Sequence, residues 1–289
     1  AMNKIIKISL PFFFLLFISF ASLPTMAQDN GELILTDYAY GKDSMQVMDI
    51  SLAKDRSLHT PLIILVHGGG WMAGDKKDAD FMRDICFSNG INVVNINYRL
   101  GSNKVHYKEM MKDIDSAIAL LQKKADEWNI RKSKYIFWGG SAGAHLSLLY
   151  AYGYDKRNVI SLVMTLGAPV KFDSSADMEG GKKSDLEGLL PIITGKPWVD
   201  NPQLVDKAYK KASPYYAKNL KPTFLVHGEK DDIVPKKQSE MLSQLLKQSN
   251  VADTLVILPN GGHGGENTPP EVSNRVNRAM YQWILRYSK

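Results

Sequence analysis

Cysteine is nearly absent from this chain, which has one, Cys86, among 289 residues. A single thiol excludes an intramolecular disulfide, so an apolar core must hold the fold together. Hydrophobic residues make up 44% of the sequence, and about 260 residues of that composition can bury a core large enough to do so. Cys86 itself lies in an apolar-periodic stretch, residues 81–87, where we expect a buried thiol.

The sequence also lacks the patterns of several binding functions. Its net charge is +6, but the lysines occur as scattered pairs with no basic block and no interleaved aromatic residues, which predicts solvated faces and no nucleic-acid partner. Asp75, Asp78 and Asp80 share a loop but lack the other oxygen ligands and the glycine of a calcium loop. No dinucleotide or phosphate loop signature is present. We therefore expect no metal and no cofactor.

The first 27 residues have the pattern of a secretory signal peptide. Lys4 and Lys7 form a basic start, residues 8–20 form an apolar run broken by Pro11, and residues 25–27 offer a cleavage site. A membrane anchor is the alternative, but the run is short for a span of about 20 residues. We expect a secreted or periplasmic protein, with residues 28–289 as its single folded domain and no stable membrane insertion after cleavage.

Strand and helix patterns alternate along the mature chain. Short apolar runs typical of buried strands are separated by stretches of helical periodicity, which predicts an α/β fold with a mostly parallel sheet and helices on both faces. Residues 45–53 instead alternate apolar and polar side chains, which indicates an early antiparallel strand. The expected buried strands are 62–66, 91–96, 135–138, 162–166, 223–226 and 255–258, and the expected helices are 110–128, 142–150, 236–247 and 272–286.

Residues 171–211 interrupt this alternation. The segment has glycine and lysine clusters, Pro191, Pro197 and Pro202, and no clear strand. We expect it to form a cap-like insertion over the carboxyl edge of the sheet. A plain surface loop is the alternative.

Four short motifs point to a chemistry. In chain order they are His67-Gly68-Gly69-Gly70-Trp71, Gly139-Gly140-Ser141-Ala142-Gly143, Asp231 within HGEKDDIVP, and His263 within GGHGG. The order serine, acid, histidine is that of the α/β-hydrolase triad, and a glycine-rich segment upstream is where that fold builds its oxyanion hole.

Ser141 is the expected nucleophile because it follows a predicted strand, begins a predicted helix and has small neighbours. A nucleophile elbow needs such neighbours because its turn is sharp. The N-terminus of the helix also favours the negative charge that develops on attack. The alternative is a glycine-rich turn that binds a phosphate or nothing.

His263 is the expected base among six histidines, because a serine hydroxyl is a poor nucleophile until a base takes its proton. It lies between two pairs of glycines after the last predicted strand, on a loop that can reach across the sheet edge. His145 is one helical turn beyond Ser141 and should point into the packing. His67 and His227 end buried strands and should brace loops by hydrogen bonds.

The acid should follow the penultimate strand, where Asp231 and Asp232 are adjacent. A carboxylate there fixes the imidazole tautomer and stabilises the imidazolium. The oxyanion formed on attack needs backbone donors, and we expect them to be the amides of Gly69, Gly70 and Ala142.

Together these segments resemble the HGGG-containing esterase and lipase branch of the α/β-hydrolase superfamily, most of all bacterial secreted carbohydrate acetyl esterases and feruloyl esterases. The similarity covers about residues 45–287 and includes Asn97-Tyr98-Arg99-Leu100, Ala212-Ser213-Pro214 and the segment from His227-Gly228 to Val234-Pro235. The spacing HG-x-x-D-x-x-V-P in that family implies that Asp231 is the acid. Asp232 then caps the helix that begins near residue 235.

We expect a serine carboxylic-ester hydrolase that works through an acyl-enzyme. The resemblance and the export signal imply short or aromatic acyl groups, acetyl or feruloyl, on carbohydrate or a small-molecule ester. Trp71, with Trp198 and Tyr209 of the insertion, should bind substrate in a compact aromatic site. The alternatives are a peptidase or amidase with the same triad, and a catalytically silent binding module, which would normally have lost a triad residue.

Overall fold

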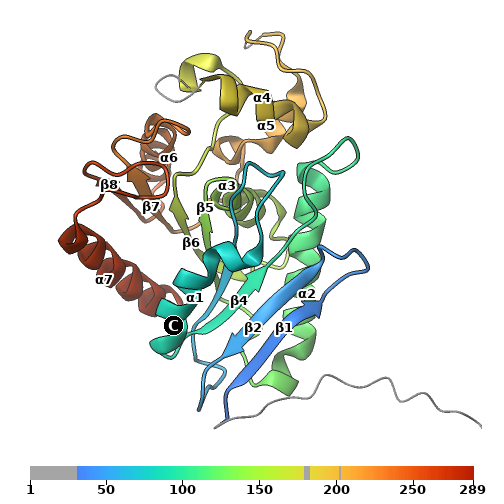
Figure 1. The fold of residues 1–289 in the computed structure, drawn as a ribbon, viewed down its shortest axis with the longest axis vertical. Coiled ribbons are helices and arrows are strands. Elements are labelled where there is room, and N and C mark those ends of the chain that lie inside the picture. The colour runs from blue at the N-terminus through green and yellow to red at the C-terminus, as the bar shows by residue number, and fades with distance from the viewer. Residues whose placement is uncertain (1–30, 179–182, 202) are drawn as a thin grey trace, which may run out of the picture.

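The computed structural model describes residues 31–178, 183–201 and 203–289. They form an eight-stranded sheet with the strand order β1-β2-β4-β3-β5-β6-β7-β8 (Figure 1). β2 pairs antiparallel with both β1 and β4, and the remaining neighbours pair in parallel. The strands are β1 (Leu33–Ala39), β2 (Val47–Leu52), β3 (Leu62–Val66), β4 (Asn92–Ile96), β5 (Tyr135–Gly140), β6 (Ile160–Leu166), β7 (Thr223–Gly228) and β8 (Asp253–Leu258).

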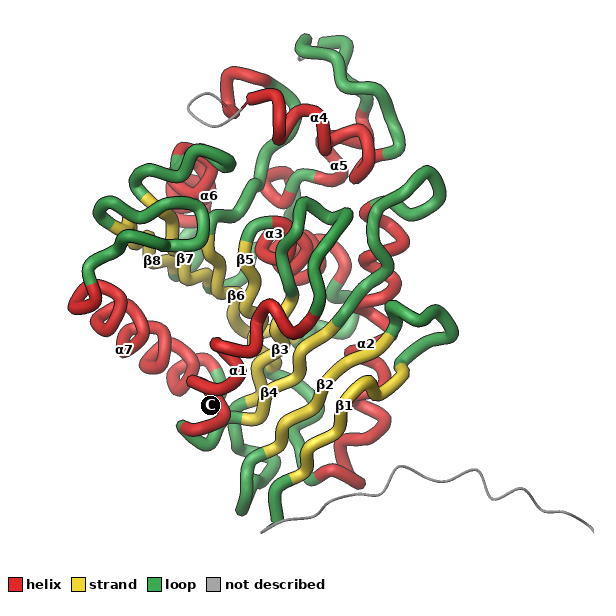
Figure 2. The backbone as a smooth tube through the Cα atoms, in the orientation of Figure 1, coloured by secondary structure: helices red, strands yellow, loops and turns green. Residues whose placement is uncertain are grey.

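Helices cover both faces of the sheet, as the tube drawing in Figure 2 shows. One face packs against α1 (Asp80–Ser88) and α7 (Pro270–Tyr287). The other packs against α2 (Tyr107–Trp128), α3 (Ala142–Leu149) and α6 (Lys237–Gln248). The short helical segments are 3-10 turns at Lys76–Ala79, Ser175–Met178 and Pro214–Tyr216, and a π-helical turn at Tyr150–Tyr154.

The two cores follow from the twofold side-chain period of the strands. In β3, Ile63 and Leu65 face the α1 and α7 side, whereas Leu62, Ile64 and Val66 face the α2 and α3 side. Every residue of this strand is fully buried, which requires a continuous apolar run rather than an alternating one. The predicted α/β class is therefore confirmed, and each predicted strand and helix forms within three residues of its expected bounds.

Two elements near the start of the sheet had no predicted counterpart. β1 is an edge strand whose pairing with β2 shifts register between Leu35 and Tyr38, where Asp37 has φ of 51°. This bulge breaks the alternation that would have indicated a strand. In α1, Phe81 and Ile85 stay 55% and 41% exposed, so the apolar residues of 81–87 do not all lie on the buried face.

Residues 171–211 lie between β6 and β7 and hold α4 (Lys183–Thr194) and all but the last residue of α5 (Lys207–Ala212). Figure 1 shows both helices beyond one end of the sheet. A Cβ built on Gly70 would lie 3.0 Å from Leu189, so α4 packs against the HGGG loop. His106, just before α2, donates from its ring Nδ1 to the Ile192 carbonyl at 2.7 Å. This hydrogen bond connects α4 to the start of α2.

The predicted signal peptide lies outside the described residues. None of the helices in the described ranges is both long and apolar enough to span a membrane.

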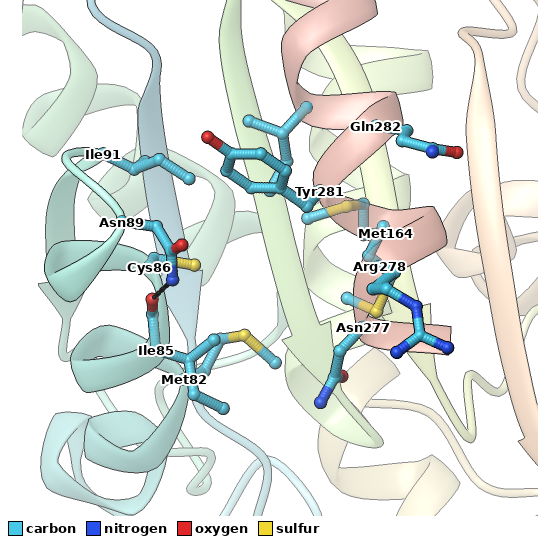
Figure 3. Close-up of a pocket in the computed structure, with 12 residues that line it drawn as sticks. Met82, Ile85, Cys86, Asn89, Ile91, Met164, Asn277, Arg278, Tyr281 and Gln282 are labelled. Atoms are coloured by element: carbon cyan, nitrogen blue, oxygen red, sulfur yellow. Dashed lines mark hydrogen bonds between the residues drawn. The ribbon is translucent and has the colours of Figure 1, made fainter. Parts of the chain in front are cut away.

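A groove of about 380 Å³ separates α1 from α7 (Figure 3). Its lining includes Cys86, Met164 and Met280 and no residue of the four motifs. Cys86 is 4% exposed, as predicted, and burial raises the pKa of its thiol to about 12. A thiol of that acidity is unreactive near neutral pH, so Cys86 acts as a packing residue.

Candidate active site

Ser141 occupies a strained turn between β5 and α3. Its backbone has φ of 51° and ψ of −120°, a conformation that a residue with a side chain adopts only when the surrounding structure imposes it. The Ser141 amide donates to the Leu166 carbonyl of β6 at 2.8 Å, and the Ser141 carbonyl accepts from the His145 amide at 3.0 Å. This turn therefore presents the Ser141 side chain at the end of the sheet, as a nucleophile elbow does.

The glycines around Ser141 have separate structural reasons. A Cβ on Gly143 would lie 2.0 Å from the Val66 carbonyl oxygen, and a Cβ on Gly139 would lie 2.5 Å from the Gly143 backbone. Both contacts are impossible, so glycine lets α3 pack directly on β3. A Cβ on Gly140 would meet nothing within 4 Å, so only two of the three glycines are sterically required.

His263 and Asp231 form a hydrogen-bonded pair, although 32 residues separate them. His263 Nδ1 donates to Asp231 Oδ2 at 2.8 Å, because a carboxylate oxygen can only accept. This bond fixes the tautomer of the ring and leaves the lone pair of Nε2 free to take a proton. The His263 side chain is 20% exposed, whereas that of Asp231 is fully buried.

The Asp231 carboxylate is held from several directions. Burial alone would raise its pKa, but hydrogen bonds from His227, His263 and the Val234 amide hold the pKa well below the usual range. Oδ1 accepts from the amides of Ile233 at 3.0 Å and Val234 at 2.8 Å. The carboxylate is therefore charged at neutral pH and cannot rotate freely.

The end of β6 brings Ser141 and His263 to the same place. The Leu166 carbonyl accepts from Ser141, and a Cβ on the next residue, Gly167, would lie 3.2 Å from His263 Cε1 and Nδ1. No hydrogen bond from the Ser141 hydroxyl is found among the described residues. Such bonds are often long in an enzyme without substrate and shorten in the complex.

The HGGG loop lies beside the nucleophile turn. A Cβ on Gly68 would lie 3.5 Å from Ser141 Cβ. Gly69 and Gly70 have φ of 104° and 58°, and the Gly69 carbonyl accepts from the amides of Met72 and Ala73. The amides of Gly69 and Gly70 have no acceptor within the described part of the chain, and Ala142 is the first residue of α3, where amides lack an intrahelical acceptor. These three groups are free to bind an oxyanion.

The Trp71 side chain packs inside the protein, whereas we expected it to line the substrate site. The indole is 1% exposed, and its Nε1 donates to His145 Nδ1 at 3.0 Å. His145 Nε2 in turn donates to the Ala212 carbonyl at 2.7 Å. Trp71 thus joins the HGGG loop to α3 and to the end of the insertion. The sequence placed Trp71 beside the oxyanion glycines but gave no sign that φ of 64° turns its side chain inward.

Tyr209 is also buried, so the aromatic wall expected from the insertion does not form as predicted. Its ring packs edge-on against Trp198 at 5.1 Å, and its hydroxyl donates to the Lys196 carbonyl at 2.6 Å. These contacts hold α5 to the end of α4. Leu189 of the insertion lies against Gly70, and no sequence motif marked it.

Asp232 does not cap the helix after it, which corrects a second prediction. α6 begins at Lys237, and its N-cap position, Lys236, has no side-chain cap. Asp231 instead accepts from the backbone amides of Ile233 and Val234 through its Oδ1. One carboxylate therefore both orders the loop and contacts His263.

The other histidines fulfil structural expectations. His145 is fully buried, and burial lowers its pKa to about 4, so it is neutral above that pH and can accept from Trp71. His67 stacks on Tyr98 with ring centroids 4.3 Å apart and donates from Nδ1 to the Gly68 carbonyl at 2.8 Å. Both rings fix the loops around the nucleophile.

Gly167 gives a direct test of the space available to the His263 ring. We expect Gly167→Ala to lower kcat by about 10- to 100-fold, because the new methyl displaces the ring and a shift of about 1 Å can cost about 100-fold. The substitution also forces alanine into φ of 62°, at a cost of about 1 kcal/mol. The measurement is kcat for a chromogenic ester together with the melting temperature.

Gly90→Ala is the matched control. Gly90 has φ of 74°, but a Cβ there would meet nothing within 4 Å. It therefore carries the same backbone strain without a contact to the site. Equal kcat in the two variants would contradict the assigned position of His263.

The strand order, the strained serine turn after β5, and a carboxylate and histidine after β7 and β8 together define an α/β-hydrolase. The chain belongs to the BD-FAE family, whose model matches residues 48–246.

Individual relatives agree with this class. The chain is 28% identical to esterase LipQ of Mycobacterium tuberculosis over 86% of its own length and 61% of that protein. Among solved structures, it superposes on a truncated carbohydrate esterase from gut microbiota with a TM-score of 0.74 and 21% identity, covering 91% of this chain and 99% of the other. It superposes equally well, at a TM-score of 0.74 and 21% identity, on a bifunctional GH43-CE protein of Bacteroides eggerthii, covering 89% of this chain and 35% of that one.

The chain spans only part of the curated relatives that it matches, for example 61% of LipQ. The structural neighbours, at 21% identity, establish the fold.

Proposed function

We propose that this protein hydrolyses carboxylic esters through an acyl-enzyme on Ser141, with His263 as the base and Asp231 as the acid of the triad. The observation that carries the proposal is the geometry at the sheet edge. A serine in a strained turn faces the loop of a histidine whose Nδ1 is bound to a fully buried carboxylate at 2.8 Å.

Acylation begins when Ser141 Oγ attacks the ester carbonyl carbon. His263 Nε2 takes the hydroxyl proton, and the charged Asp231 stabilises the imidazolium that results. The carbonyl oxygen becomes an oxyanion that accepts from the free amides of Gly69, Gly70 and Ala142. One such donor typically lowers the barrier by about 3–4 kcal/mol. The intermediate then collapses, the carbon–oxygen bond to the alcohol breaks, and His263 returns its proton to the departing alcohol.

Deacylation repeats these steps with water. His263 Nε2 takes a proton from the water as its oxygen attacks the acyl carbon, and the same amides bind the second oxyanion. Collapse breaks the bond to Ser141 Oγ, which regains its proton from His263. The free carboxylic acid leaves, and no other reactant is needed.

Short or aromatic acyl groups on carbohydrate are the substrates that we propose. Two structural neighbours are described as a carbohydrate esterase and a GH43-CE protein, which supports a sugar as the alcohol part. Leu189 packs against Gly70, next to the proposed oxyanion donors, which supports a compact acyl site. We also propose that the protein acts outside the cytoplasm, on the basis of the pattern in residues 1–27.

A panel of esters tests the substrate class. We expect p-nitrophenyl acetate and butyrate to be hydrolysed with higher kcat/KM than the dodecanoate, without activation by a lipid interface, because Leu189 limits the space beside the oxyanion donors. Acetylated xylan and methyl ferulate added to the panel separate acetyl from hydroxycinnamoyl specificity. Higher kcat/KM on the dodecanoate than on the acetate and butyrate would contradict the proposal, whereas hydrolysis of an anilide but of no ester would favour an amidase.

A further inference from the structure

A second imidazole, that of His227, contacts the same oxygen of Asp231 that binds His263. His227 Nε2 lies 3.1 Å from Asp231 Oδ2, whereas His263 Nδ1 lies 2.8 Å from it. His227 lies near the end of β7, and both its side chain and that of Asp231 are fully buried. Water therefore cannot replace this contact.

The surroundings of His227 decide which ring nitrogen carries a proton. Nε2 faces the Val234 carbonyl at 2.8 Å and Asp231 Oδ2, and both oxygens can only accept. Nε2 must therefore be protonated; it donates to the Val234 carbonyl, and Asp231 Oδ2 lies 3.1 Å from the same nitrogen. Nδ1 lies 2.7 Å from Ser239 Oγ of α6, whose hydroxyl can donate to it. The ring is anchored at both ends, between the acid loop and α6.

With this contact, each oxygen of the Asp231 carboxylate has two N–H groups within 3.1 Å. Oδ1 binds the amides of Ile233 and Val234, and Oδ2 binds His263 and His227. We infer that His227 is a positioning residue for the catalytic acid: its Nε2–H holds the carboxylate in the plane that His263 needs and withdraws charge from the shared oxygen. This inference rests on the proposed function.

Loss of the His227 donor should change the pH dependence of turnover. Within the described residues, the titratable groups that contact this carboxylate are His227 from β7 and His263 from the loop after β8, while α6 contributes the uncharged Ser239. Loss of the His227 donor leaves more negative charge on Oδ2, which favours the His263 imidazolium. His263 must be neutral to act as a base, so the acid limb of kcat/KM moves to higher pH.

Two substitutions at one position separate the donor from the packing. In His227→Gln, the side-chain amide nitrogen can occupy the place of Nε2 and still donate to Asp231. In His227→Asn, the amide nitrogen reaches only as far as Nδ1, so the donor is lost. We expect His227→Asn to lower kcat by about tenfold or more, the size seen when the outer partner of a metal ligand is removed, with KM changed less than threefold. We expect His227→Gln to restore kcat to within threefold of wild type.

Ser239→Ala is the control for stability. It removes the partner of Nδ1 in the same buried cluster but leaves the Nε2–H on Asp231, so the melting temperature should fall while kcat and the acid limb stay in place. Two results would overturn the inference. One is a His227→Asn variant with the same kcat and pH profile as Ser239→Ala. The other is a His227→Gln variant that is as impaired as His227→Asn at an equal melting temperature.

A measurement on the unmodified protein covers the case in which a variant fails to fold. With ¹⁵N-labelled histidine, NMR should show His227 protonated at Nε2 throughout the active pH range. A signal that assigns the His227 proton to Nδ1 alone would overturn the inference. Wild-type protein with no ester hydrolysis and no labelling of Ser141 would instead overturn the proposed function itself.

Discussion

Ser141→Ala is expected to remove nearly all ester turnover while the protein stays folded. The covalent intermediate cannot form without Oγ, and loss of the nucleophile in a serine triad costs on the order of 10⁶ in kcat. The Ser141 hydroxyl has no hydrogen-bond partner among the described residues, so its loss leaves no buried group unsatisfied. The measurement is kcat on p-nitrophenyl acetate with the melting temperature recorded for the same sample.

Ser147→Ala provides a matched control in the same helix. The Ser147 hydroxyl is buried and donates to the Gly143 carbonyl at 2.7 Å, so its removal should cost stability of about 1 kcal/mol but not catalysis. If Ser141→Ala retains more than about a hundredth of wild-type turnover, Ser141 is not the nucleophile.

The adjacent carboxylates should give opposite results. Asp231→Asn is expected to lower kcat on the order of 10⁴-fold, because the amide no longer fixes the tautomer of His263. It should also lower the melting temperature, because the charged Oδ1 of Asp231 orders the loop by accepting from the amides of Ile233 and Val234. Asp232→Asn should leave kcat within threefold, since the Asp232 side chain is exposed.

The pH dependence separates this loss from simple unfolding. Asp231 has a pKa well below the usual range, so its contribution to stability is complete above the unfolded pKa and is lost only as pH falls through the folded value. Wild-type protein should therefore lose stability in acid, while Asp231→Asn should lose less over the same range. If Asp232→Asn is inactive while Asp231→Asn keeps its turnover, the catalytic acid is Asp232 and not Asp231.

Much of this architecture is visible in the sequence because strands buried on both faces must be continuous apolar runs. β3 and β5 are examples, and the chemical motifs follow directly where each strand ends. Gly139 and Gly143 were predicted as turn residues, and the close approach of α3 to β3 gives the reason. The placement of Asp231 rather than Asp232 against His263 also agrees with the family spacing.

What the sequence did not reveal depends on side-chain direction. Trp71 follows three glycines, and whether its indole points to solvent or to His145 is decided by a backbone angle that no motif encodes. Aspartate is a common helix-cap residue, which favoured Asp232, but Asp231 already binds the amides of the loop that follows β7. His227 was expected to brace a loop, and its contact with the acid depends on the path of residues 228–234, which local periodicity cannot predict.

The most direct measurement of the central claim is covalent labelling of Ser141. Treatment with diisopropyl fluorophosphate, followed by digestion and mass spectrometry, should place one phosphoryl group per chain on the peptide that contains Ser141. Labelling should be absent in Ser141→Ala and strongly slowed in His263→Ala, because the attack needs the free Nε2 lone pair as base. An unlabelled Ser141 in a protein that hydrolyses esters, or labelling at the same rate without His263, would contradict the account.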